Sequence, residues 1–265
     1  MSLFNYLKVP VEMAEFALRE RQVSKVGVYL TAQKIYSGKA PTGNETVTKI
    51  GSACDLKPRS VYKALRWLQN RNWIGKNTSD GWMFFNSINQ VHQTERWKYS
   101  RSALMYDKDL QSIKPFLIGA FLASVCRSGN MGTGTERLSK RSESSPNPVS
   151  LSFIEKALKV SNKTAYNYRK LAEKYQYIKM YQNLRQVKGI NLSDVKQMKQ
   201  NHVDNVMVPL FGSTKTISVK PDQLICEKGI VYVQLPNLIL PLIPLGKRNL
   251  RRYRYPKPIL PCGSC

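Results

Sequence analysis

Apolar residues recur at helical spacing in two stretches of the chain that lie 104 residues apart. In the first stretch, the i, i+3, i+4, i+7 pattern of a helix with one buried face is formed by Val61, Ala64, Leu65 and Leu68. In the second stretch, the expected buried stripe is formed by Ala165, Tyr168, Leu171, Ala172 and Tyr175. Each pattern predicts an amphipathic helix packed on a core.

These two helices belong to an internal repeat. Residues 47–76 align with residues 151–180 without a gap, and a helical segment precedes each copy, at 25–36 and at 116–127. Each copy shows a short helix, a three-residue break, a longer amphipathic helix and then a β-favouring aromatic–Ile pair. The shared order of elements, more than the few identities, indicates two copies of one structural unit.

Turn and cap signals support this interpretation. Pro58 stands at the first position of the longer helix in copy one, where its missing N–H costs nothing. Ser161 can cap the corresponding helix in copy two. The turn-rich residues 77–81 separate two β-favouring runs, which predicts a hairpin after the first helix pair.

The pattern predicts an α+β protein with two tandem helix-turn-helix units, each followed by a β-hairpin. The expected organisation is a first domain at 1–86, a connector at 87–112, a second domain at 113–202 with a flexible insertion at 127–150, a β-rich extension at 203–246 and a basic tail at 247–265. The longest apolar runs, 116–126 and 238–245, are shorter than a bilayer-spanning helix, and no secretory signal is visible. We expect a cytoplasmic, nucleoid-associated protein.

Charge narrows the choice of partner. The 265-residue chain has 42 Lys and Arg against 17 Asp and Glu, a formal net charge of +25 that is concentrated in the second half. A compact body with this excess repels itself unless a polyanion lies against it, so nucleic acid is the leading candidate, ahead of an anionic membrane surface. A basic but inert protein is the simple alternative.

Residues for catalysis are scarce. The two histidines, His92 and His202, stand alone, no phosphate-binding glycine loop is present, and the Cys262–Cys265 pair lacks further zinc ligands. Asp107 and Asp109 lie in a polar stretch where a solvated loop is expected. The sequence favours a protein that is not an enzyme and uses no cofactor or metal.

Candidate DNA contacts lie on the helix faces opposite the buried stripes, because the second helix of a helix-turn-helix enters the major groove. In copy one these are Arg59, Ser60, Tyr62, Lys63 and Arg66, with Lys76 on the predicted hairpin. In copy two they are Lys163, Thr164, Asn167 and Lys170. Arginine pairs bidentately with guanine and asparagine with adenine, so both faces have the chemistry to read bases. A merely solvated basic face is the alternative.

The basic tail is a further candidate, for phosphate contacts rather than base contacts. It carries Lys247, Arg248, Arg251, Arg252 and Arg254, with two tyrosines interleaved and no acid from 247 to 257. A disordered, solubilising tail would have the same composition.

Residues 28–76, from VYLTAQ to VTKIGSACDLKPRSVYKALRWLQNRNWIGK, resemble the winged-helix domains of replication initiators of bacterial plasmids and phages. That family closes the longer helix with Leu-x-x-x-Gly-Leu-Ile, and here Asn72 takes the glycine position, as Gln176 does in copy two. The resemblance implies double-stranded DNA binding at a plasmid, phage or mobile-element origin, together with the replication machinery. It also implies that one domain forms a homodimer, for which the less charged first domain is the candidate. A transcriptional regulator and a non-catalytic DNA-binding subunit of a recombination or nuclease complex are the alternatives.

Overall fold

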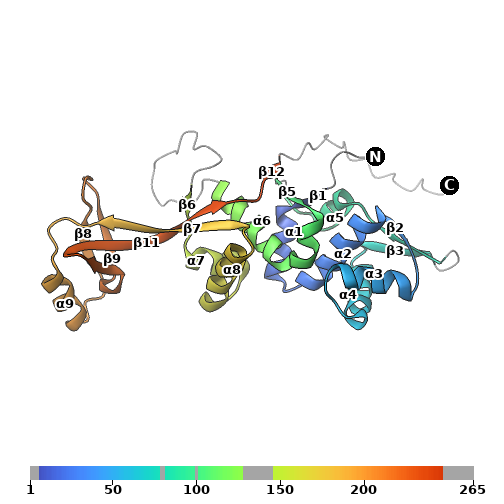
Figure 1. Ribbon diagram of the computed structural model, residues 1–265, viewed down its shortest axis with the longest axis horizontal. Coiled ribbons are helices and arrows are strands. Elements are labelled where there is room, and N and C mark those ends of the chain that lie inside the picture. Colours follow the sequence, from blue (N-terminus) through green and yellow to red (C-terminus); the bar gives the residue numbers. More distant parts are fainter. Residues whose placement is uncertain (1–5, 78–80, 99–100, 128–145, 247–265) are drawn as a thin grey trace, which may run out of the picture.

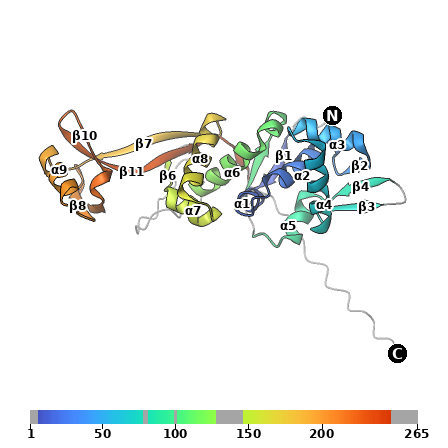
Figure 2. The ribbon, with the colours of Figure 1, turned by 90° about the horizontal axis from the view of Figure 1, so that it is seen from below.

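The structure is a computed structural model that describes residues 6–77, 81–98, 101–127 and 146–246. Helices and strands are mixed along the chain, as expected for an α+β protein. Two helix-and-sheet modules lie side by side, and a long β-ribbon carries a small terminal unit away from them (Figure 1). Figure 2 shows the same elongated arrangement from below.

The first module has three helices and a three-stranded antiparallel sheet. Its elements are α2 (Val23–Tyr36), β2 (Lys39–Pro41), α3 (Asn44–Ala53), α4 (Pro58–Asn70), β3 (Ile74–Asn77) and β4 (Trp82–Phe85). The last strand lies between the other two, in the order β2-β4-β3. Strand β1 (Leu7–Pro10) and helix α1 (Val11–Arg19) precede the module.

The second module repeats the same order of elements. They are α6 (Ile113–Arg127), β6 (Asn147–Pro148), α7 (Leu151–Leu158), α8 (Asn162–Lys174), β7 (Ile178–Gln186) and β11 (Ile230–Pro241). Strand β11 lies between β6 and β7, so the strand that is last in sequence is again central. Helix α8 has the bounds of α4 shifted by 104 residues, and β7 begins 104 residues after β3.

Residues 203–246 do not form the separate extension that the sequence predicts. The predicted strands are present, but β11 runs on to Pro241, and its second half pairs with Ile178–Tyr181 of the second module. The insertion expected at 127–150 is also shorter, since β6 and the buried Val149 belong to the module. Residues 128–145 lie outside the described residues.

Between β7 and β11 the chain forms a small tip unit. It contains α9 (Leu192–Gln200), β8 (Val206–Pro209), β9 (Thr216–Val219), the 3-10 turn η2 (Pro221–Gln223) and β10 (Leu224–Glu227). Its own apolar core includes Val195, Val208 and Val219, together with Val231 and Val233 from β11. The tip is therefore a separate packing unit on the end of the ribbon.

The connector packs on both modules. It forms α5 (Ile88–Thr94), β5 (Ser102–Met105) and the 3-10 helix η1 (Asp107–Ser112). Strand β5 pairs with β1 on one side and with β12 (Leu245–Gly246) on the other, so the described chain returns to the first module at its end.

Helix α6 joins the two modules because it contributes to both cores. Phe116, Leu117 and Ala120 belong to the core of the first module, while Phe121 and Leu122 belong to that of the second. The stretch Asp107–Cys126 is long and apolar enough to cross a bilayer by length and composition, but 72% of its most apolar window is buried inside the protein. It therefore has the surroundings of a core helix.

The core faces of α4 and α8 match position by position, with one exchange. Val61, Ala64, Leu65 and Leu68 are buried as predicted, and the residues 104 positions later are also buried: Ala165, Tyr168, Arg169 and Ala172. The expected place of Tyr175 in this stripe is wrong, because Tyr175 is the residue after the last turn of α8 and its side chain is 46% exposed. Leu171 is half-buried. Arg169 thus takes the core position that Leu65 has in the first module.

Candidate nucleic-acid interface

The predicted contact residues lie at equivalent positions on α4 and α8. We define the α4 face as Arg59, Ser60, Lys63 and Arg66, and the α8 face as Lys163, Thr164, Asn167 and Lys170, each 104 residues after its counterpart. All eight side chains are exposed except that of Thr164, which is half-buried. Both helices lie along the lower edge of the molecule in Figure 1.

The cations of these faces are not neutralised within the described part of the chain. Four ion pairs occur among residues 6–77, 81–98, 101–127 and 146–246, and they involve Arg19 twice, Lys34 and Arg71. None includes a cation of the α4 or α8 face. Unpaired exposed cations concentrated on one helix face form a surface suited to a polyanion.

On α4, Tyr62 lies beside the α4 face with its side chain 48% exposed. Its hydroxyl donates a hydrogen bond to Oδ1 of Asn44, in the first turn of α3. The hydrogen bond joins α4 to α3. Tyr62 is thus an exposed aromatic residue at the margin of the α4 face that is tied to α3.

On α8, the cap and the contact face share residues. The Ser161 hydroxyl accepts a hydrogen bond from the Thr164 backbone N–H at 3.3 Å, so the predicted cap is confirmed. The Thr164 hydroxyl lies 3.0 Å from the same Ser161 oxygen, which ties this candidate contact residue to the cap. Asn167 is exposed on the next turn.

An aromatic residue missed by the sequence analysis completes the α8 surface. Tyr166, 44% exposed, is the counterpart of Tyr62, and Lys170 Nζ lies 4.9 Å from its ring centroid. Hydrogen bonding to Tyr166 raises the pKa of Lys170 above its ordinary value. The identity of Tyr62 and Tyr166 in the repeat was the available signal.

Further basic–aromatic pairs lie on the strands. Lys179 Nζ lies 5.2 Å from the ring of Tyr181 on β7, and Lys39 Nζ lies 4.2 Å from a Trp82 ring in the first sheet. Lys76 lies in β3, but its side chain is outside the described part of the structure. Also outside the described residues are the candidate contacts of the tail, Lys247, Arg248, Arg251, Arg252 and Arg254, together with Cys262 and Cys265.

One of the two aspartates of the connector, Asp109, is buried, which corrects the solvated loop expected for it. Asp109 is 2% exposed and accepts hydrogen bonds from the Tyr177 hydroxyl and the Tyr106 backbone N–H, both at 2.7 Å. The Tyr177 hydroxyl also lies 2.7 Å from Ser112 Oγ. Asp107, whose side chain is 61% exposed, pairs with Lys34. The buried carboxylate thus joins the connector to the second module.

The described ranges contain no recognisable metal-binding centre. Within them, no group of three His, Cys, Asp or Glu side chains is placed to hold an ion. His92 is buried, and its Nε2 lies 3.3 Å from the Lys98 carbonyl oxygen, while His202 is exposed in the tip unit.

Comparisons with protein-family models, with curated proteins and with solved structures find no match to this chain.

Proposed function

We propose that this protein binds double-stranded DNA sequence-specifically through two winged-helix modules, without catalysis. The observation that carries the proposal is the coincidence of fold and chemistry at an offset of 104 residues. Two modules share the same element order and the same central last strand, and each exposes a cationic or polar face at the same positions of its third helix. Helix-turn-helix proteins use this helix in the major groove.

Some of these side chains are suited to base contacts and others to phosphate contacts. Arg59 and Arg66 have the planar donor fork that pairs with guanine O6 and N7, and Asn167 has the amide that pairs with adenine N6 and N7. Lys63, Lys163 and Lys170 have point charges suited to phosphates. Tyr62 and Tyr166 add flat, half-exposed rings beside each face. The hairpin strands that follow each third helix act as wings in this proposal.

We further propose that the DNA sites lie at a replication origin of a plasmid, phage or mobile element. The support is the resemblance of residues 28–76 to initiator winged helices and the presence of two reading helices in one chain. Tandem heads on one polypeptide suit sites repeated in the same direction. A transcriptional regulator instead predicts a single palindrome over a promoter.

The test is selection of bound duplexes from a random library, followed by footprinting of the selected sequence in the source genome. Arg59→Ala, Arg66→Ala and Asn167→Ala should each weaken cognate binding by about 1–3 kcal/mol and relax preference at one position. Lys8→Ala is the matched control, because Lys8 is exposed. Its strand, β1, lies on the upper side of the molecule in Figure 1, whereas α4 and α8 lie along the lower edge. If the wild-type protein selects no sequence, specific binding is wrong. Equal losses on every duplex would make the three residues phosphate contacts.

A further inference from the structure

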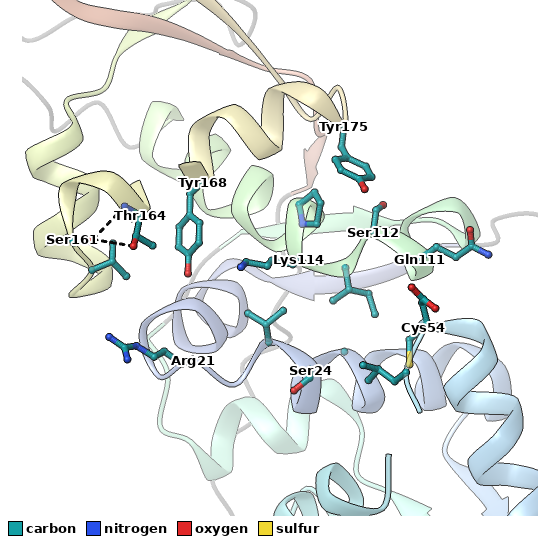
Figure 3. Close-up of a pocket in the computed structure, with 17 residues that line it drawn as sticks. Arg21, Ser24, Cys54, Gln111, Ser112, Lys114, Ser161, Thr164, Tyr168 and Tyr175 are labelled. Atoms are coloured by element: carbon teal, nitrogen blue, oxygen red, sulfur yellow. Dashed lines mark hydrogen bonds between the residues drawn. The ribbon is translucent and has the colours of Figure 1, made fainter. Parts of the chain in front are cut away.

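A cleft of about 810 Å³ separates the two modules (Figure 3). On the side of the first module its wall includes Arg21, Ser24 and the turn between α3 and α4, residues 54–56. On the side of the second module it includes Lys114 and Tyr168, with Ser161 and Thr164 at the start of α8. The cleft is thus lined by both modules, and its hydroxyl and cationic side chains lie beside apolar ones such as Val23, Ile113 and Val160.

Each side of this cleft carries one exposed cation. Arg21 and Lys114 are exposed, and neither forms an ion pair with a carboxylate of the described residues. Lys114 Nζ lies 5.3 Å from the ring centroid of Tyr168. Burial raises the pKa of Tyr168, and the charge of Arg21 opposes that rise, so Arg21 acts on the same side chain. In Figure 3, Arg21 and Lys114 lie on either side of the Tyr168 hydroxyl.

The cleft also lies between the starts of the two proposed reading helices. Residues 54–56 come directly before Lys57 and α4, while Ser161 and Thr164 form the first turn of α8. The N-terminal residues of a recognition helix are those that reach base edges. The cleft therefore lies where the sugar–phosphate backbone of a duplex in contact with both helix starts would pass.

We propose that the cleft binds the phosphodiester backbone of duplex DNA between the sites read by α4 and α8, with Arg21 and Lys114 as its phosphate contacts. This inference rests on the proposed function and adds a third contact surface to it. Phosphate contacts fix the register of a protein on the duplex without reading sequence. The cleft would hold the two helices on one DNA molecule. Asp55, also on its wall, is a carboxylate that repels the backbone.

The experiment compares Arg21→Gln, Lys114→Gln and the double variant with the matched control Lys8→Gln, by fluorescence anisotropy on cognate and random duplexes over a range of salt. All three residues are exposed, so the variants should keep the fold, which circular dichroism and thermal unfolding check. The double variant should lose about tenfold in affinity on both duplexes, and its slope of log K against log[salt] should be shallower by about 1.8, for two phosphates. Asp55→Asn should bind both duplexes more tightly.

The outcomes separate the two proposals. Unchanged affinity and slope in the double variant, with wild-type binding intact, would overturn the role of the cleft and leave DNA binding in place. No DNA binding by the wild-type protein would overturn both. A last measurement tests whether inorganic phosphate stabilises the wild-type protein and the double variant. If millimolar phosphate stabilises the wild-type protein but not the double variant, and DNA affinity does not change between them, the cleft is a site for a free anion and the backbone role is wrong.

Discussion

Asn72 and Gln176, 104 residues apart, both adopt left-handed backbone conformations, with φ angles of 57° and 59°. Each follows the end of its third helix, and the next residue closes the same bond: Trp73 N–H donates to the Leu68 carbonyl and Tyr177 N–H to the Ala172 carbonyl, both at 2.9 Å. This is the Schellman motif, whose left-handed position favours glycine. The resemblance to initiator winged helices placed glycine at this position, and the structure keeps the conformation without it.

Gln176→Gly should therefore stabilise the protein. The left-handed conformation costs a residue with a Cβ about 1–2 kcal/mol, and glycine removes this cost. The greater flexibility of glycine in the unfolded chain cancels part of that gain. We expect a gain of about 0.5–1 kcal/mol in the free energy of unfolding, measured by urea denaturation. Asn72→Gly should give a smaller change, because asparagine tolerates this conformation better than glutamine. A larger gain at Asn72 than at Gln176 would contradict this explanation.

Arg169 occupies the core position that Leu65 has in the first module, and its side chain is 6% exposed. Burial lowers the pKa of its guanidinium, and its Nε has no hydrogen-bond partner among the described residues. An unsatisfied buried donor costs about 1–3 kcal/mol.

Arg169→Leu should accordingly raise the free energy of unfolding by about 1 kcal/mol, since replacing buried charges by apolar residues is neutral or stabilising. The reciprocal change Leu65→Arg should destabilise by about 3 kcal/mol or more, because it buries an unpaired charge in the first core. Thermal unfolding of both variants measures these two changes in stability. Arg169→Leu that lowers stability would show that the guanidinium has a structural partner.

Much of the fold follows from sequence because the interactions within each copy of the repeat are local. The helix bounds of α4 and α8, the Ser161 cap and the buried stripe through Leu68 depend on residues within a few turns of each other. The return of β11 is not local, since more than forty residues of the tip unit separate it from β7. Asp109 shows the same limit, because its burial depends on Tyr177, 68 positions away.

The candidate interface divides in the same way. The two helix faces are visible in sequence, because helical periodicity separates exposed from buried positions on one element. The cleft is not visible in sequence, because Arg21 and Lys114 lie far apart along the chain and line one cleft only after α6 has packed between the cores. Neither cation alone indicates an anion-binding site in the sequence.

Glu95 gives a prediction for acid. Burial acts to raise the pKa of Glu95, but hydrogen bonds from Arg71 and Trp73, at 2.9 Å and 2.7 Å, and the charge of Arg71 outweigh it, so the pKa lies below its usual value. A carboxyl with a lowered folded-state pKa contributes stability that is present above the unfolded-state pKa, near 4.3, and is lost as pH falls through the folded-state pKa.

Glu95→Gln should lower stability at pH 7 by about 1–2 kcal/mol, because Arg71 loses its charged partner. The difference between wild type and variant should shrink as pH falls below about 4 and the wild-type carboxyl takes up its proton. Urea denaturation at pH 7 and at about pH 3.5 measures both differences. A difference that stays constant over this range would mean that the Glu95 charge does not stabilise the fold.

The tip unit is expected to be dispensable for folding of the second module. Val187 N–H donates to the Val231 carbonyl at 2.9 Å, so these residues face each other across the ribbon where the tip begins. Replacing residues 188–230 by Asn-Gly would join them through a two-residue hairpin turn, which this dipeptide favours. The core around Ile178 and Ile239 is separate from that of the tip. We expect the variant to fold cooperatively, with a loss in the free energy of unfolding of about 3 kcal/mol or less from exposing Val231 and Val233.

Under the proposed function, the variant that lacks the tip should also keep its preference for cognate over random duplex, because the α4 and α8 faces are untouched. Thermal unfolding and anisotropy measure the two properties. A folded variant without that preference would place base contacts on the tip, whereas an unfolded one would show that the ribbon depends on the tip core.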